Sequence, residues 1–354
     1  MKNNVEKWIT EEDFLLESGE KLEDLIVAYQ TFGTLNPQKD NVVWICHALS
    51  GDTNPTQWWE GIVGPGLVID TKRYFVVCAN NLASPYGSTH PLSFKRNKER
   101  YFRSFPLVTT RDTARAFDLL RISLGISKIK HLVGTSYGGQ IALEWNILNS
   151  NVFESSILIA TNAQHSPHGI AFNESQRLAI ESDGSFYRKS LLGGKTGLVA
   201  ARSIALLSYR TAALYNQTQQ ENFNGELSKF KASSYQQYQG VKFALRFDAF
   251  SYHAITKSMD AHNVGRNRGG LHRALGVIQN PCLVIGVNSD GLFPKEEQEF
   301  LAEQIPNAQL GIIDSPYGHD GFLIEKEQII EYLDDYINNN FNRNKITKFK
   351  KVAV

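Results

Sequence analysis

Apolar residues gather along the chain in short, uninterrupted runs that are rich in Val, Ile and Leu, and each run ends in a polar or glycine-containing loop. Runs of this kind favour strands buried on both faces, as in a parallel sheet covered by helices. An earlier run at 25–33 precedes the turn residues Asn36 and Pro37 and predicts an antiparallel strand. The buried strands are predicted at residues 42–46, 74–79, 131–133, 155–160, 283–287 and 310–313.

Between these runs, apolar residues recur at helical spacing, as over 112–124 and 322–337. The alternation of strand and helix predicts an α/β fold with a mostly parallel sheet. From residue 161 to residue 270 the strand-like runs disappear, and helical stretches rich in Gln, Ser, Tyr and Arg replace them. We therefore expect an α/β core formed by residues 1–160 and 271–354, and a helical insertion over 161–270 that caps it.

The composition is that of an ordinary globular protein. The chain has 354 residues, 42% of them apolar, and a formal net charge of +1, so electrostatics give no reason to expect binding to nucleic acid or to an anionic membrane. Its three cysteines lie in apolar runs, which indicates reduced thiols, and no cluster of ligand residues predicts a metal site. No apolar run is long enough to span a bilayer, so we expect a soluble cytoplasmic protein.

The first candidate for chemistry is Ser136, which stands between two glycine positions in the sequence Gly134-Thr-Ser-Tyr-Gly138. A buried run precedes this stretch and a helical pattern follows it, so the serine lies at a strand-to-helix turn. Small residues allow such a turn to be sharp, and the turn lifts the serine hydroxyl above the sheet. The stretch therefore predicts a nucleophile elbow. A glycine-rich turn that contains a serine without a catalytic role would show the same sequence pattern.

An acid and a histidine follow the serine, each just beyond a later predicted strand. Asp290 comes after the run at 283–287, and His319 comes after the run at 310–313. The chain order Ser, Asp, His at three strand ends is the order of the α/β-hydrolase triad. We predict Ser136 as nucleophile, His319 as general base and then general acid, and Asp290 as the group that orients the imidazole.

The loop after the run at 42–46 lies at the carboxyl edge of the predicted sheet, where ligands bind in α/β folds. In hydrolase-like sheets this loop supplies one oxyanion donor, and the residue after the nucleophile supplies the other. We therefore predict the backbone amides of Leu49 and Tyr137 as the oxyanion hole. The side chains of His47 and Ser50 are interpreted as caps of the loop.

Nearly the whole chain resembles the homoserine O-acetyltransferase family of the α/β-hydrolase superfamily. The resemblance rests on motifs in the predicted core and in the predicted cap. These are His47-Ala48-Leu49 with Gly51, Trp58-Trp59-x-Gly61, Tyr74 to Cys78 with Asn80, Phe105-Pro106-x-Val108-Thr109-x-Arg111-Asp112, Ala142 to Trp145, Asn173-Glu174-x-Gln176-Arg177, Ala201-Arg202-x-Ile204-Ala205, Ser208-Tyr209-Arg210, Arg246 to Ala249, Ser289-Asp290-x-Leu292-Phe293-Pro294 and Gly318-His319-Asp320.

The resemblance implies a ping-pong transfer of an acetyl group from acetyl-CoA, the acyl-donor substrate, to the hydroxyl of L-homoserine in methionine biosynthesis, with no other cofactor. It also implies that Arg202 and Asp320 hold the amino acid with Tyr209 nearby, and that the protein is a homodimer. A guanidinium suits the α-carboxylate and a carboxylate suits the α-ammonium. Arg210 competes with Arg202 for this role, and either arginine could instead form an ion pair within the structure.

The sequence also departs from the family pattern. Ala83, Pro85 and His90 stand where the family usually has Gly or Cys, and the stretch 94–103 is unusually basic. These departures leave succinyl-CoA open as the donor and serine open as the acceptor. A triad alone is also compatible with an esterase or thioesterase that acts on water, and the fold alone with a non-catalytic binding protein.

Overall fold

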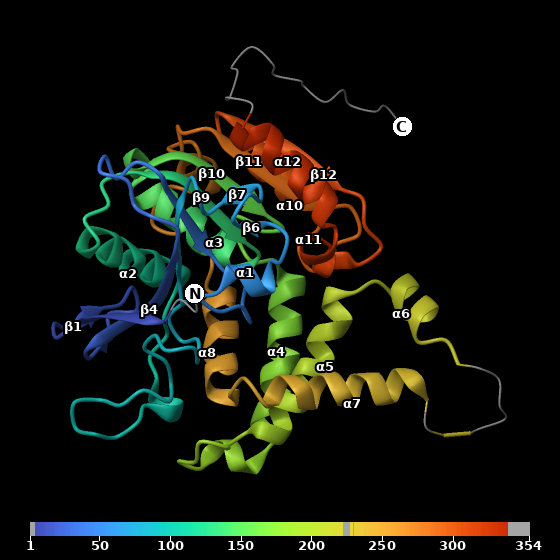
Figure 1. Ribbon diagram of the computed structural model, residues 1–354. Helices are drawn as coiled ribbons and strands as arrows, with labels where there is room; N and C mark the ends of the chain where they lie inside the picture. Colours follow the sequence, from blue (N-terminus) through green and yellow to red (C-terminus); the bar gives the residue numbers. More distant parts are fainter. Residues whose placement is uncertain (1–3, 222–226, 229, 339–354) are drawn as a thin grey trace.

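The computed structural model describes residues 4–221, 227–228 and 230–338. Its centre is an eight-stranded sheet in the order β1-β4-β8-β5-β9-β10-β11-β12 (Figure 1). The strands from β8 to β12 in this order are parallel, whereas β1 and β4 join the edge antiparallel. The bounds are β1 Glu6–Thr10, β4 Leu25–Phe32, β5 Val42–Cys46, β8 Phe75–Ala79, β9 Ile129–Thr135, β10 Phe153–Ile159, β11 Cys282–Val287 and β12 Ala308–Ile313.

Burial on both faces explains why the central strands read as continuous apolar runs. All five residues of β5 are buried, and they alternate between the two faces of the sheet. Trp44 belongs to the cluster that contains Phe117 of α2 (Thr110–Ser123) and Trp145 of α3 (Tyr137–Leu148). Ile45 belongs to the cluster that contains Leu333 of α12 (Lys326–Asn338) on the other face. The predicted α/β fold with a mostly parallel sheet is confirmed.

The chain between β10 and β11 forms a set of helices that projects from one side of the sheet (Figure 1). Its two ends lie side by side, because Gln164 and Asn263 form an antiparallel bridge and the amide of His165 donates to the carbonyl of His262 at 3.1 Å. We call these elements the insertion helices. They are α4 Pro167–Glu181, α5 Lys195–Tyr209, α6 Ala212–Thr218, α7 Lys231–Ala244 and α8 Ala249–Asp260, followed by α9 Leu271–Leu275.

Several short elements differ from the sequence-based expectation. The final helix predicted over 322–337 is two helices, α11 (Gly321–Ile324) and α12, because the chain turns at Glu325, whose carboxylate accepts a hydrogen bond from Ser315 Oγ at 2.8 Å. The remaining bounds are β2 Phe14–Leu15, β3 Lys21–Leu22, α1 Pro55–Trp58, β6 Val63–Gly64, β7 Ile69–Asp70, α10 Lys295–Gln304 and the 3₁₀ turns Phe102–Ser104, Ser150–Val152, Gly184–Tyr187 and Gly318–Asp320. Among the described residues, no helix combines the length and the apolar character needed to cross a bilayer.

Candidate active site

The turn between β9 and α3 holds Ser136 in a backbone conformation that side-chain-bearing residues rarely adopt. Its φ is +52° and its ψ is −124°, a region that costs of order 1–3 kcal/mol and occurs mainly at functional sites. The two flanking glycines are required sterically. A Cβ on Gly134 would lie 2.6 Å from Ala142 Cβ, and a Cβ on Gly138 would lie 2.1 Å from the carbonyl oxygen of Cys46. Only glycine allows β5 and β9 to approach the helix so closely.

The structure joins the three predicted triad residues by hydrogen bonds. Ser136 Oγ lies 2.8 Å from His319 Nε2, and His319 Nδ1 lies 2.6 Å from Asp290 Oδ2. The other carboxylate oxygen, Asp290 Oδ1, accepts from the amides of Leu292 and Phe293 at 2.8 and 2.9 Å. The carboxylate is therefore fixed in orientation, and the imidazole is held with Nε2 toward the serine.

The environment of His319 favours its protonated form. Burial of the ring lowers its pKa, but the charge and hydrogen bond of Asp290, together with the charge of Asp320, outweigh burial and raise the pKa. Three aromatic rings enclose the imidazole, with centroid distances of 5.0 Å to Phe293, 5.3 Å to Phe322 and 5.9 Å to Tyr209. The imidazole can therefore accept the serine proton while it is largely shielded from water.

The two predicted oxyanion donors lie at neighbouring strand ends. Leu49 follows β5, Tyr137 follows β9, and the two strands pair in parallel with Cys46 opposite Gly134. Within the described part of the chain, neither the amide of Leu49 nor that of Tyr137 has a hydrogen-bond acceptor. Two free N–H groups beside the nucleophile are the donors that a tetrahedral oxyanion needs.

The large side chain next to the nucleophile is packed into the protein core. Tyr137 is fully buried, and its hydroxyl lies 2.9 Å from Ser258 Oγ of α8. Burial raises the pKa of this phenol to about 12. Two of the departures from the family pattern lie in the loop after β8, where Ala83 takes a φ of +68° that glycine adopts at lower cost, and where His90 Nδ1 lies 2.9 Å from the carbonyl of Ser88.

The insertion helices bring Arg202 and Tyr209 of α5 to this site. The guanidinium of Arg202 lies 5.2 Å from the Tyr209 ring centroid and 4.7 Å from that of Phe243, and no carboxylate of the described chain forms an ion pair with it. Burial raises the pKa of Tyr209, the charge of Arg202 opposes this, and the charge of Asp320 adds to it. Tyr209 therefore lies close enough to Arg202 and Asp320, the two residues predicted to bind the amino acid, for their charges to affect its pKa.

Arg210 occupies a different position from Arg202. Its Nε donates to Asp320 Oδ2 at 3.0 Å, and its Nη1 donates to the hydroxyl of Tyr235. Asp320 thus already has an arginine partner, whereas Arg202 has its positive charge available to a ligand. The loop that carries His319 packs on this segment, because a Cβ on Gly318 would lie 2.7 Å from the carbonyl oxygen of Tyr209.

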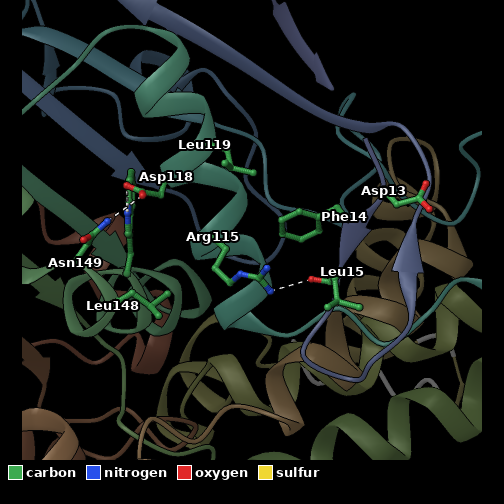
Figure 2. A pocket seen from close by; sticks show the side chains of 9 residues that line it. Asp13, Phe14, Leu15, Arg115, Asp118, Leu119, Leu148 and Asn149 are labelled. Atoms are coloured by element: carbon green, nitrogen blue, oxygen red, sulfur yellow. Dashed lines mark hydrogen bonds between the residues drawn. The ribbon is translucent and has the colours of Figure 1, made fainter. Parts of the chain in front are cut away.

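Two surface hollows lie away from the triad. One has a volume of about 440 Å³, and Figure 2 shows its lining, where Arg115 donates to the carbonyl of Leu15 at 2.9 Å and Asp118 accepts from Asn149 at 2.9 Å. The second, of about 460 Å³, is lined by residues of α6 and α7 such as Tyr215 and Ala232. Within the described residues, no group of three or more His, Cys, Asp and Glu side chains could hold a metal ion. The triad is thus a separate site from both hollows.

Comparison with known proteins supports the fold described above and identifies the family within it. A family model described as the α/β hydrolase fold matches residues 41–326. A homoserine O-acetyltransferase from Cyclobacterium marinum is 46% identical over 332 residues, which cover 93% of this chain and 94% of that protein. The chain belongs to the homoserine O-acetyltransferase family. The family resemblance predicted from the sequence is thereby confirmed.

The solved structures that this member of the homoserine O-acetyltransferase family resembles include both transferases and hydrolases. The crystal structure of a homoserine O-acetyltransferase from Bacillus anthracis superposes with a TM-score of 0.85 at 25% identity, covering 94% of this chain and 97% of that one. An acetylester hydrolase from Corynebacterium glutamicum superposes with a TM-score of 0.83, also at 25% identity, covering 94% of this chain and 95% of that one. The backbone alone therefore does not separate transfer to an alcohol from transfer to water.

Sequence reasoning did not assign roles to several residues that the structure places at the site. Phe293 and Phe322 enclose the imidazole of His319, and Phe293 stands only three residues after Asp290 in a motif that was visible in the sequence. The contact of Arg210 with Asp320 joins residues 110 positions apart, so no local pattern could show it.

Proposed function

We propose that this protein is a homoserine O-acetyltransferase that transfers the acetyl group of acetyl-CoA to the hydroxyl of L-homoserine. The observation that carries the proposal is an intact Ser136–His319–Asp290 hydrogen-bond chain in a protein 46% identical to a homoserine O-acetyltransferase along almost its whole length. This activity is a step of methionine biosynthesis and assigns the protein to the cytoplasm. In the proposed reaction acetyl-CoA is a substrate and not a bound cofactor. The triad and the oxyanion donors carry out the acyl transfer without a metal ion.

In the first half-reaction, Ser136 Oγ attacks the thioester carbonyl while its proton moves to His319 Nε2. The tetrahedral oxyanion accepts hydrogen bonds from the amides of Leu49 and Tyr137. The C–S bond then breaks, and the CoA sulfur leaves with the proton from His319. The carboxylate of Asp290, fixed 2.6 Å from Nδ1, stabilises the imidazolium that forms between these two steps.

In the second half-reaction, His319 removes the proton from the homoserine hydroxyl, which attacks the acetyl carbon of the acyl-enzyme. Collapse of the second oxyanion releases O-acetylhomoserine and returns a proton to Ser136. The guanidinium of Arg202, which has no carboxylate partner in the described part of the chain, is the group best suited to the α-carboxylate, and Asp320 with Tyr209 suits the α-ammonium. Arg210 then has a supporting role, because it holds Asp320 at its Oδ2.

We also propose that residues 161–270 act as a cap over the core formed by residues 1–160 and 271–354. A cap limits the access of water to the acyl-enzyme, which a transferase needs in order to favour an alcohol acceptor. Exposed leucines lie in or directly after the insertion helices, among them Leu178 of α4, Leu207 of α5 and Leu245 just after α7, at 56%, 56% and 74% exposure. These residues support a homodimer formed through the insertion helices.

The alternative that an experiment must separate from acetyl transfer is ester hydrolysis, the activity for which the structural neighbour from Corynebacterium glutamicum is named. The decisive assay measures CoA release from acetyl-CoA and from succinyl-CoA, each with homoserine, with serine and without an acceptor, and repeats every arm with Ser136→Ala. Multiple-turnover release that requires acetyl-CoA and homoserine together, and that is lost in the variant, supports the proposal. Without an acceptor, the ping-pong mechanism allows about one equivalent of CoA per active site, so continued release beyond that burst identifies water as the acceptor. A preference for succinyl-CoA or serine overturns the corresponding half of the assignment.

A further inference from the structure

The peptide group between Ala48 and Leu49 is held from one side by a buried histidine. His47 Nδ1 lies 2.8 Å from the carbonyl oxygen of Ala48, and the amide of Gly51 donates to the same oxygen at 3.0 Å, which closes a turn. The imidazole fills the space beside Gly51, where an added Cβ would lie 3.0 Å from His47 Cβ. The histidine therefore contacts the same peptide unit that carries the predicted oxyanion donor of Leu49.

The hydrogen bonds of the ring determine which nitrogen carries the proton. His47 Nε2 accepts from the backbone amide of Asn81 at 3.2 Å, and Nδ1 faces the Ala48 carbonyl oxygen, which can only accept, so the proton of the neutral ring is assigned to Nδ1. Asn81 Nδ2 lies 3.3 Å from Nδ1, and with this tautomer it does not donate to the ring. Burial lowers the pKa of His47, which keeps the ring neutral. Asn81 also donates through Nδ2 to the carbonyl oxygen of His47 at 3.1 Å, so the ring and its backbone are held together against the end of β8.

The direction of the Leu49 amide follows from peptide geometry. In a trans peptide the C=O and N–H bonds point in opposite directions, and the described chain contains no cis peptide. When His47 and Gly51 hold the Ala48 oxygen, the N–H of Leu49 must point away from the imidazole. The loop also adjoins the nucleophile turn, since a Cβ on Gly138 would lie 2.6 Å from the carbonyl oxygen of His47.

We propose that His47 is a positioning residue that orients the Leu49 amide toward the oxyanion through its Nδ1–H bond to the Ala48 carbonyl. The inference deepens the proposed function and rests on it, because it takes Leu49 as an oxyanion donor. It predicts that loss of the Nδ1–H donor impairs formation of the acyl-enzyme and not the binding of the acyl donor. Two kinds of variant separate this role from general support of the loop.

The first test compares His47→Leu with His47→Asn, measured by release of p-nitrophenol from p-nitrophenyl acetate in the full-length protein. An asparagine amide can place a donor where Nδ1 lies, whereas leucine has none. We expect His47→Leu to lower kcat about 10²-fold with an almost unchanged KM, the effect of a displaced oxyanion donor. His47→Asn should recover at least about tenfold of that loss. Equal activity of both variants and the wild type overturns the inference.

The second test is a double-mutant cycle with Leu49→Pro. Proline lacks an amide proton but suits the second position of a turn, so this variant removes the donor and keeps the turn. If His47 acts through the Leu49 amide, His47→Leu adds no further loss of kcat to Leu49→Pro. If the two losses multiply, His47 acts elsewhere and the inference is wrong. The thermal midpoint of each variant is measured, and His47→Phe replaces His47→Leu in the cycle if the leucine variant does not fold.

The ester assay also distinguishes this inference from the function on which it rests. Release of p-nitrophenol by the wild type that disappears in Ser136→Ala shows an active nucleophile, whatever the natural acceptor is. Against that background, unchanged His47 variants contradict only the positioning role. An inactive wild-type protein contradicts the proposed function, and the role of His47 is then overturned with it.

Discussion

Replacement of Gly138 by alanine tests how closely the nucleophile turn and the oxyanion loop depend on each other. The added Cβ would lie 2.1 Å from the carbonyl oxygen of Cys46, 2.5 Å from its carbonyl carbon and 2.6 Å from the carbonyl oxygen of His47. All three atoms belong to the backbone, so no side-chain rotation can relieve the contact. Cys46 ends the buried central strand β5, and the backbone must therefore separate at the loop or at the start of α3.

The size of this displacement sets the expected effect. Real Cβ atoms hardly ever approach another heavy atom closer than 3.0 Å, so the 2.1 Å contact at Gly138 must lengthen by about 0.9 Å. A misplacement of about 1 Å at catalytic groups can cost about 10²-fold in rate. Overpacking of this kind also destabilises proteins by about 1–3 kcal/mol. We expect Gly138→Ala to lower the rate of acyl-enzyme formation about 100-fold and to lower the thermal midpoint.

Gly291 provides a matched control, because it directly follows the predicted triad residue Asp290 but has no atom within 4 Å of an added Cβ. Gly291→Ala should keep the wild-type rate within about twofold, since substitutions away from packing contacts are usually nearly neutral. The assay is rapid mixing with a chromogenic acetyl ester, together with a thermal melt of each variant. A Gly138→Ala protein that acylates at the wild-type rate would refute the argument that glycine is sterically required there.

Three further predictions address charge at and around the site. Although burial lowers the pKa of His319, neighbouring carboxylates including Asp320 raise it. Because the neutral imidazole is the base, Asp320→Asn should move the acidic limb of the acylation pH profile to lower pH, and an upward shift would contradict this. Arg202→Met should raise the KM for homoserine about 10- to 100-fold in steady-state assays and leave the rate of acyl-enzyme formation unchanged. A parallel loss of that rate would contradict a role of Arg202 in binding the carboxylate of homoserine. Glu144→Gln removes the buried carboxylate that pairs with two arginines, and it should lower the free energy of unfolding, measured in urea, by about 3 kcal/mol. Glu154→Gln removes one partner of an exposed ion pair, and it should lower the same free energy by less than about 0.5 kcal/mol. Similar losses in both variants would contradict that difference.

Much of the core could be predicted because its strands are buried on both faces. The run at 42–46 matches β5 residue for residue, since no exposed position interrupts it. The edge strand β1 was not predicted, because three of its five residues are exposed and its pattern resembles a surface loop. The short strands β6 and β7 were not predicted either, because strands of two residues are too short to show a period.

The candidate site also has residues that could be predicted from the sequence and residues that could not. The three triad residues could be predicted because each follows its own strand, and the parallel order of the sheet brings strand ends together. The role of His47 could not be predicted, because it depends on a contact with Asn81 from another strand end. Likewise, the sequence left Arg210 as a competitor of the predicted Arg202, and only the three-dimensional structure shows that Arg210 is paired with Asp320.

The side-by-side ends of the insertion helices have a consequence for how such enzymes diverge. The bridge between Gln164 and Asn263 closes the insertion at its base, while β10 and β11 pair directly, with Ser156 opposite Cys282. Residues can therefore be added, deleted or exchanged within the insertion without changing the register of the sheet that holds the nucleophile and the acid. Selection can alter the choice of acyl acceptor and the chemical step independently, so one ancestral architecture can give rise to enzymes that acylate alcohols and to enzymes that hydrolyse esters.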